Sequence, residues 1–360
     1  MTVEPILAST LWPAYQHTND TTPTEPPKKR GKLATHCKSL DDALSGGLEY
    51  GVIHCISAEA DAGAKQLSHA LIATHLLDLD HAEATIIDTT NSFDVRGLHQ
   101  LLASRLQTGG KDAREKAVRV LGRARIMKAF DFVGLTECVA ELREHLEAGP
   151  PPSSPSVFHQ QQPKAPRGTV GDSEDEDEML DGPSPPVPVT RPLPESKQSF
   201  NLLVIDNITH VTTPLLKNSH VQGQALLTSF MRSLAHLTKT HRLCTVLHNA
   251  AMSYTPAAAT SNSGGPAAAE DRPSIFSSCM LRPALGRSFA YLVDLHLLVH
   301  KVPLEAEDAK AIYGTQAPGR TADQRKLATV LEVLTDRHSS RVGRWAAFRT
   351  DAGGKLTGII

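Results

Sequence analysis

The chain has 360 residues, of which 40% are hydrophobic, so it can bury a sizeable core as one large domain or two small ones. Its 37 Lys and Arg residues nearly balance 39 Asp and Glu residues, which argues against a strongly basic nucleic-acid-binding protein. The five cysteines are scattered, with no Cys-x-x-Cys pair or metal-type spacing, and this favours a reducing compartment. Without a secretion-type start or an apolar stretch of about 18 residues, we expect neither secretion nor membrane insertion.

Residues 1–32 are expected to form a disordered tail, because Thr, Pro and polar side chains leave too little apolar surface to offset the entropy of ordering. The tail ends in the basic cluster PPKKRGK, which contains Lys28, Lys29, Arg30 and Lys32. Such a cluster is typical of a nuclear import signal, although ordinary protein surfaces carry similar clusters. It favours a nuclear location.

Short apolar runs alternate with longer amphipathic runs from Val52 onward, a pattern typical of β-α units around a parallel sheet. The runs that we expect to form buried strands are VIHCIS from Val52, ATIID from Ala84, ARIMKAF from Ala124, LLVID from Leu202 and LCTVLH from Leu243. The segments between them that we expect to form helices are 64–79, 95–106, 135–146 and 222–240.

Three further apolar runs follow without a helical pattern between them: LHLLVH from Leu295, LATVLEVL from Leu327 and RWAAFRT from Arg344. We expect these late strands to extend the sheet in antiparallel orientation. The sequence therefore predicts an α/β fold, with a mostly parallel central sheet flanked by helices and with late antiparallel strands. A single core would comprise residues 33–148 and 199–360.

Two segments interrupt this pattern. Residues 149–198 are rich in Pro and acidic side chains and are expected to form a disordered insertion, and residues 253–273 are expected to form a flexible loop. The run DSEDEDEMLD from Asp172 carries 7 acidic residues and no basic one. Ser173 in this run suits an acid-directed kinase, and the run itself fits either a solvated spacer or a tether that competes with DNA for the core.

The first expected strand and helix are joined by CISAEADAGAKQLSHAL, at the place of a phosphate-binding P-loop. A working P-loop reads G-x-x-x-x-G-K-[ST], in which glycines let backbone N–H groups approach phosphate, lysine neutralises it and the hydroxyl holds Mg²⁺. The same register here gives Ala58, four further residues, then Gly63, Ala64 and Lys65. One glycine is kept, whereas the lysine and the hydroxyl are lost.

The lost lysine removes a charged hydrogen bond worth about 1.5–3 kcal/mol, or roughly ten- to a hundred-fold in affinity. Lys65 also places a cation where a neutral Mg²⁺ ligand belongs, so metal-dependent hydrolysis should suffer most. A slipped register would let Lys65 act as the phosphate lysine, but its side chain leaves the helix about 100° from that of Ala64. Taken alone, the segment is also compatible with a plain strand-helix turn in an unrelated α/β protein.

The run THCKSLDDALSGGLEYGVIHCIS from Thr35 resembles the segment that leads into the RecA-like P-loop core of the eukaryotic strand-exchange recombinases and their paralogues. This resemblance fixes the register of the loop, with Ala64 opposite the family's lysine. The positions that match the family's loop without a gap are Glu59, Gly63, Gln66 and Leu67.

Three later runs resemble the same family in the same order. In ATIIDTTNSF, Thr90 stands where the family has the glutamate that polarises the attacking water. In LLVIDNITHVTTPLL, Asp206 matches the Walker B position, which orients Mg²⁺ through water. In LCTVLHNAAM, Asn249 of the family's Asn-Gln sensor is kept, while Ala250 replaces the glutamine. The resemblance implies that hydrolysis is lost and that ATP and Mg²⁺ bind weakly, if they bind.

The D member of the recombinase paralogues is the member that the chain resembles most. The runs that indicate it are KAFDFVGLTECVAELRE, PLL before a Gln-Gly-Gln helix start, and RPALGRSFAYLVD. The resemblance covers residues 33–148 and 199–350. It departs from the family in lacking an N-terminal helical domain, in the insertion and in the altered site.

The resemblance also implies surfaces for partners. The segment 252–280 would be the second DNA-facing loop, and it contains Arg272 and Phe276 as candidates for contact with single-stranded DNA. RecA-like cores stack side by side and share nucleotide sites at the joint. Arg287 would lie beside such a joint and serve a neighbour's site, unless it is an ordinary surface arginine.

Taken together, these features predict a non-hydrolysing recombinase paralogue in homologous-recombination DNA repair, with no catalytic residue of its own. It would be a subunit of a complex with other paralogues that assists the strand-exchange recombinase on single-stranded DNA. One alternative is a DNA-dependent ATPase with an atypical P-loop that uses Lys65 and Asp206, although Thr90 supplies no carboxylate base. Another is a small-molecule P-loop kinase, for which neither 149–198 nor 253–273 has the composition of an ordered lid.

Overall fold

The computed structural model describes residues 31–106, 111–148, 201–253, 273–313, 326–351 and 353–359. Three predicted segments lie outside the described residues: the disordered insertion, nearly all of the tail, and the flexible loop except for its two end residues. Ser173 and Arg272 lie in these segments. Among the described residues, no helix combines the length and the hydropathy that a membrane span requires.

A ten-stranded sheet forms the centre of the described fold, in the order β12-β11-β10-β9-β3-β7-β6-β4-β5, with β8 (Leu281–Pro283) paired to β7 off this path. All five predicted early strands are present: β3 (Val52–Ala58), β4 (Ala84–Asp88), β5 (Ala124–Lys128), β6 (Leu202–Asp206) and β7 (Cys244–Ser253). They run parallel to one another. These strands could be recognised in the sequence because a parallel sheet is buried on both faces, so that each of its strands is a continuous apolar run.

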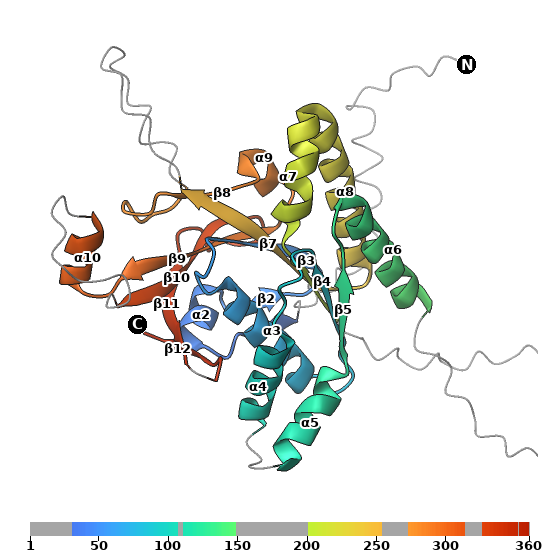
Figure 1. Cartoon of the computed structure of the whole chain (residues 1–360), viewed down its shortest axis with the longest axis horizontal. Helices are drawn as coiled ribbons and strands as arrows, with labels where there is room; N and C mark the ends of the chain where they lie inside the picture. The colour runs from blue at the N-terminus through green and yellow to red at the C-terminus, as the bar shows by residue number, and fades with distance from the viewer. Residues whose placement is uncertain are drawn as a thin grey trace, which may run out of the picture.

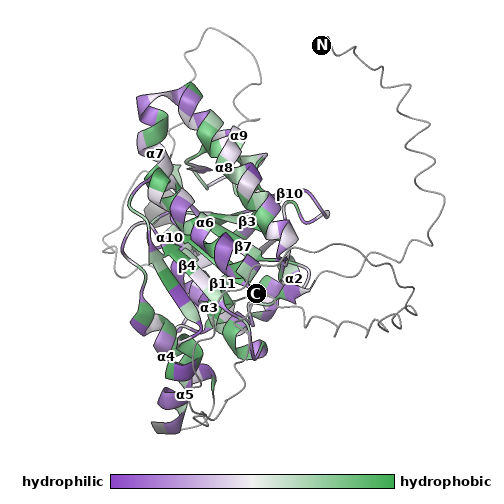
Figure 2. Ribbon diagram, turned by 90° about the vertical axis from the view of Figure 1, so that its right-hand side faces the viewer, coloured by the Kyte–Doolittle hydropathy of each residue, from purple (hydrophilic) through white to green (hydrophobic). Residues whose placement is uncertain are grey.

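Helices cover both faces of this sheet, as Figure 1 shows. Ile86 and Val204 point to the face covered by α2 (Lys38–Ala43), α3 (Ala64–Asp78), α4 (Val95–Arg105) and α5 (Lys111–Leu121). Ile87 and Ile205 point to the face covered by α6 (Phe132–Ala148), α7 (Ile208–Asn218) and α8 (His220–Thr240). Figure 2 shows hydrophilic and hydrophobic segments side by side along α5, α7 and α8, as expected for helices with one buried face.

The late strands correct one expectation. β9 (Leu295–Pro303) pairs with β3 in parallel, because the chain crosses from β7 to the other side of β3 through β8 and α9 (Gly286–Ala290). The antiparallel part begins only with β10 (Leu327–Asp336), followed by β11 (Trp345–Thr350) and β12 (Leu356–Gly358). A helix that the sequence analysis did not predict, α10 (Ala306–Tyr313), lies between β9 and β10.

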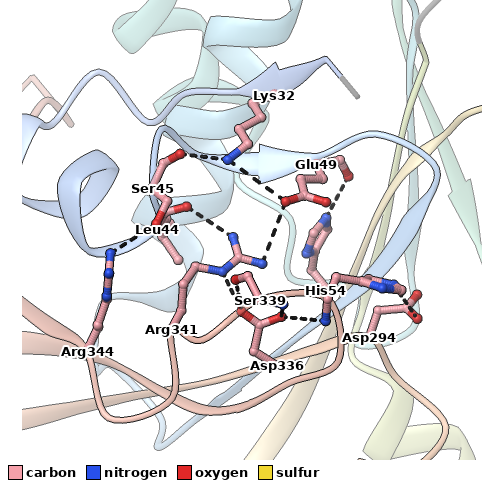
Figure 3. Close-up of polar contacts among 11 residues, drawn as sticks. Lys32, Leu44, Ser45, Glu49, His54, Asp294, Asp336, Ser339, Arg341 and Arg344 are labelled. Carbon is pink, nitrogen blue, oxygen red and sulfur yellow. Dashed lines mark hydrogen bonds and ion pairs between the residues drawn. The ribbon is translucent and has the colours of Figure 1, made fainter. Parts of the chain in front are cut away.

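The segment before β3 forms a small sheet of β1 (Lys32–Leu33) and β2 (Leu48–Glu49). Lys32, predicted as the last residue of the tail, therefore belongs to the fold, and its ammonium donates a hydrogen bond to the Ser45 carbonyl at 2.7 Å. This segment is fastened to the β10–β11 turn by polar contacts, which Figure 3 shows.

Arg341 is the centre of these contacts and is only 3% exposed. Its Nε donates to Asp336 Oδ2 at 2.6 Å, and its Nη1 donates to the Leu44 carbonyl at 3.0 Å. Burial alone would raise the pKa of Asp336, but hydrogen bonds from Arg341 and Ser339 hold it well below its ordinary value. The Arg341–Asp336 pair therefore stays charged. Through its bond to the Leu44 carbonyl, Arg341 also joins segments nearly 300 positions apart in the chain.

We predict that Arg341→Ala lowers the free energy of unfolding by about 3–5 kcal/mol, because it leaves the fully buried Asp336 carboxylate without its counter-charge. Arg344→Ala is the matched control, since Arg344 is exposed and donates one hydrogen bond, to Ser45 Oγ at 3.0 Å. The control should lose less than about 1 kcal/mol. Urea denaturation of both variants measures the difference, and equal losses would contradict a stabilising role for the buried pair.

A candidate nucleotide-binding site

The residues that the sequence analysis assigned to a nucleotide site converge at one edge of the sheet. Ala58 ends β3, and Asp206 ends β6, two strands away. Asn249 lies in β7, between them, in register with Ser57. In a parallel α/β sheet, ligands bind at the carboxyl ends of the strands. The structure therefore brings the predicted site residues of these strands together at the expected place.

Residues 59–63 connect β3 to α3, at the place where the sequence analysis predicts a phosphate-binding loop. Gly63 caps α3 with φ of 98°, a backbone conformation that favours glycine, and a Cβ atom there would make a tight contact of 3.2 Å with the Thr329 side chain. Ala64 is the first residue of α3 and is only 7% exposed. Its methyl group packs in the core at the position of the family's lysine. Glu59 and Gln66 are exposed.

Lys65 follows on the helix and its ammonium points to the loop after β4. Its Nζ donates to Ser92 Oγ at 3.0 Å, and Ser92 Oγ lies 2.6 Å from Thr90 Oγ1. The lysine is therefore engaged with neutral hydroxyl groups on the surface of the site.

Thr90 belongs to a turn organised by Asp88, a residue that the sequence analysis did not single out. The backbone N–H and the hydroxyl of Thr90 donate to Asp88 Oδ1 at 3.0 and 3.2 Å, and the Phe93 N–H donates to Asp88 Oδ2 at 2.9 Å. Burial raises the pKa of Asp88, but these hydrogen bonds outweigh it and lower the pKa below its ordinary value. The carboxylate next to Thr90 is thus committed to shaping the turn.

Asp206 faces His248, which the sequence analysis did not assign to the site. The Asp206 Oδ1 and His248 Nδ1 atoms are 3.9 Å apart, and His248 Nε2 lies 2.5 Å from Ser68 Oγ. All three side chains are buried. The signal available in the sequence was the position of His248, directly before Asn249 at the end of a buried strand.

Asn249 ties three elements together beneath the loop. Its amide nitrogen donates to Ser57 Oγ at 2.8 Å, and its amide oxygen accepts a hydrogen bond from Thr209 Oγ1 at 2.6 Å. Thr209 Oγ1 in turn accepts the backbone N–H of Ala250 at 2.9 Å. Ser57 Oγ also lies 2.7 Å from Nε2 of the buried His296. The kept half of the predicted sensor is therefore part of a buried hydrogen-bond network.

The two partner-facing candidates that the structure describes lie elsewhere. Phe276 packs edge-on against His300 and Trp345, with ring centroids 5.3 Å apart in each pair, so its ring covers the outer part of the sheet. Arg287 is exposed on α9.

The fold family implies that the site holds a nucleotide and Mg²⁺. The residues present fit the phosphates of a nucleotide better than they fit the metal ion. The loop leads into the N-terminus of α3, and helix N-termini favour phosphate through their unpaired backbone N–H groups. The metal position does not fit, because Lys65 replaces the hydroxyl ligand and Asp206 faces His248 across a cavity of about 10 Å³, the size of a single water molecule. Nor do the described residues contain a group of three or more His, Cys, Asp or Glu side chains that could hold a metal ion.

Comparison with known proteins agrees with this geometry. Residues 28–133 match the Rad51 family model, which covers less than half of the chain. The crystal structure of the RadB recombinase is similar to this chain with a TM-score of 0.52 and 16% sequence identity, covering 91% of this chain and 100% of that one. At this identity the likeness establishes the fold. The chain therefore has the fold of the RecA-like recombinases, with the sequence pattern of the Rad51 family between residues 28 and 133.

Proposed function

We propose that this protein is a non-hydrolysing recombinase paralogue that acts in homologous-recombination DNA repair. It would be a subunit of a complex that assists the strand-exchange recombinase on single-stranded DNA, touching the DNA directly or through its partners. Its sequence runs resemble those of the D member of the paralogues, and the basic cluster from Lys28 to Lys32 would direct it to the nucleus. One observation carries the proposal: a RecA-like core is kept intact while its catalytic positions hold residues that cannot perform the chemistry.

The absence of turnover follows from three positions. Ala64 supplies no charge to the phosphates, and Lys65 cannot replace the hydroxyl that holds Mg²⁺. Thr90 has no carboxylate to polarise water, and its hydroxyl is already bonded to Asp88 at 3.2 Å. Transition-state stabilisation in phosphoryl transfer depends on such charged groups, so their joint loss removes activity more completely than it removes binding.

Partner binding is supported by the edge of the sheet at β5. Among the described residues, β5 is the last strand of the sheet order and pairs only with β4, so its outer backbone groups are candidates for pairing with a strand of another chain. At the end of this strand and the start of α6, Phe130 is 72% exposed and Val133 is 63% exposed. An open strand edge beside two exposed apolar side chains suits a neighbouring core. Arg287 is the proposed contributor to a neighbour's nucleotide site.

The first prediction from this proposal concerns ATP hydrolysis. Wild type and Asp206→Ala should hydrolyse ATP at the same rate, because the wild-type site lacks the groups that would use Asp206. The rates are measured on the purified protein, and again after co-purification with its partners so that a site completed by a neighbour is included. Faster hydrolysis by wild type in either setting, together with its loss in Lys65→Ala, would instead establish the atypical ATPase.

A second prediction concerns the sheet edge. Phe130→Asp should reduce the recovery of co-purified partner paralogues at least about tenfold, since a charge in a buried apolar contact costs more than about 1.4 kcal/mol. Val221→Asp is the control, because Val221 is also exposed but lies on α8. Circular dichroism verifies that both variants are folded. Undiminished recovery with Phe130→Asp would show that partners bind another surface.

A further inference from the structure

The space that would hold a divalent metal in this fold is filled by the protein's own side chains. A RecA-like core orients Mg²⁺ between the hydroxyl after the P-loop lysine and the Walker B aspartate. The corresponding residues here are Lys65 and Asp206, and the cavity between them measures about 10 Å³. The cavity is lined by Lys65, Ser68, His69, Phe93, Asp94, Val204, Asp206 and His248.

His248 is the side chain that faces Asp206 in this space. It extends from β7, and its Nδ1 lies 3.9 Å from Asp206 Oδ1 on β6. On the other side of the ring, Nε2 lies 2.5 Å from the hydroxyl of Ser68 on α3. Contacts to two further elements therefore fix the orientation of the imidazole, and the ring is buried.

The charges of the site agree with this arrangement. Burial lowers the pKa of His248, the Asp206 carboxylate opposes that shift and the Lys65 ammonium adds to it. The Nδ1 side of the ring faces the Asp206 carboxylate, and its Nε2 side is engaged with the Ser68 hydroxyl. The aspartate thus faces an imidazole of the protein itself, in the space that a metal ion would otherwise occupy.

We propose that His248 is an internal occupant of the metal position, so that any nucleotide held by this chain is bound without a divalent cation. The proposal rests on the non-hydrolysing function and adds a further cause of it, independent of Ala64, Lys65 and Thr90. Repair of the P-loop alone would not restore a metal site, because the ring and its Ser68 contact would still fill the space in front of Asp206.

The test restores the missing groups in the full-length chain in two steps. The starting variant carries Ala64→Lys and Lys65→Thr, which completes the lysine and hydroxyl of the loop. His248→Thr is then added to empty the space; a β-branched residue suits strand β7, and its hydroxyl offers Ser68 a partner. The matched control adds His248→Gln instead, because glutamine keeps a long side chain that can reach Ser68 while removing the imidazole.

Binding of a fluorescent ATP analogue is measured in MgCl₂ and in EDTA. The His248→Thr triple variant should bind at least about tenfold more tightly in MgCl₂ than in EDTA, whereas the starting variant and the His248→Gln variant should show no preference. Equal Mg²⁺ dependence in the starting variant would overturn the proposal. So would a folded His248→Thr variant without Mg²⁺ dependence.

If the variants do not fold, a measurement on the wild-type protein tests whether His248 occupies the metal position. The imidazole nitrogen resonances of His248 should stay unchanged when MgCl₂ and ATP are added together, because no metal reaches Asp206; a shift that requires MgCl₂ would overturn the proposal.

The non-hydrolysing function and the role of His248 can be rejected separately. ATP hydrolysis by wild type would reject the non-hydrolysing function, whereas inert wild type with Mg²⁺-dependent binding in the starting variant would reject only the role of His248.

Discussion

The hydrogen bonds of Asn249 hold together the edge of the sheet on which the site is built. They join Ser57 on β3 to Thr209 on α7, and the backbone N–H of Ala250 completes the set. Because these polar groups are buried, loss of any partner would leave an unsatisfied group at a cost of about 1–3 kcal/mol. The sheet edge below the loop is therefore held by contacts within the protein.

The site residues contact one another closely within the protein. A working P-loop collects phosphate and metal charges that the protein must balance, whereas here Ala64 contributes a buried methyl group and His248 faces Asp206. Lys65 supplies the positive charge near the site but directs it to the hydroxyl of Ser92. Under the proposed function, each of these residues would replace a ligand contact of an ordinary site with a contact inside the protein.

Much of the fold was predictable from local sequence because the central strands are buried on both faces and read as unbroken apolar runs. α7 was missed because Pro214 lies inside it, and the parallel orientation of β9 was missed because strand direction depends on the crossover and not on the strand's own residues. The Ser68–His248 contact joins residues 180 positions apart. No local pattern encodes such a contact, so the sequence indicated which groups the site had lost but not what replaced them.

A subunit that hydrolyses ATP and a subunit that only binds partners place opposite demands on this edge of the sheet. Turnover requires an opening that admits nucleotide and metal and then releases products, and such mobile segments are drawn from the less stable parts of a fold. A subunit that only presents surfaces gains from a closed, rigid site, because flexibility there would have to be ordered again when a neighbour binds. The buried His248 and the exposed Phe130 beside β5, the edge strand of the described sheet, fit the second demand.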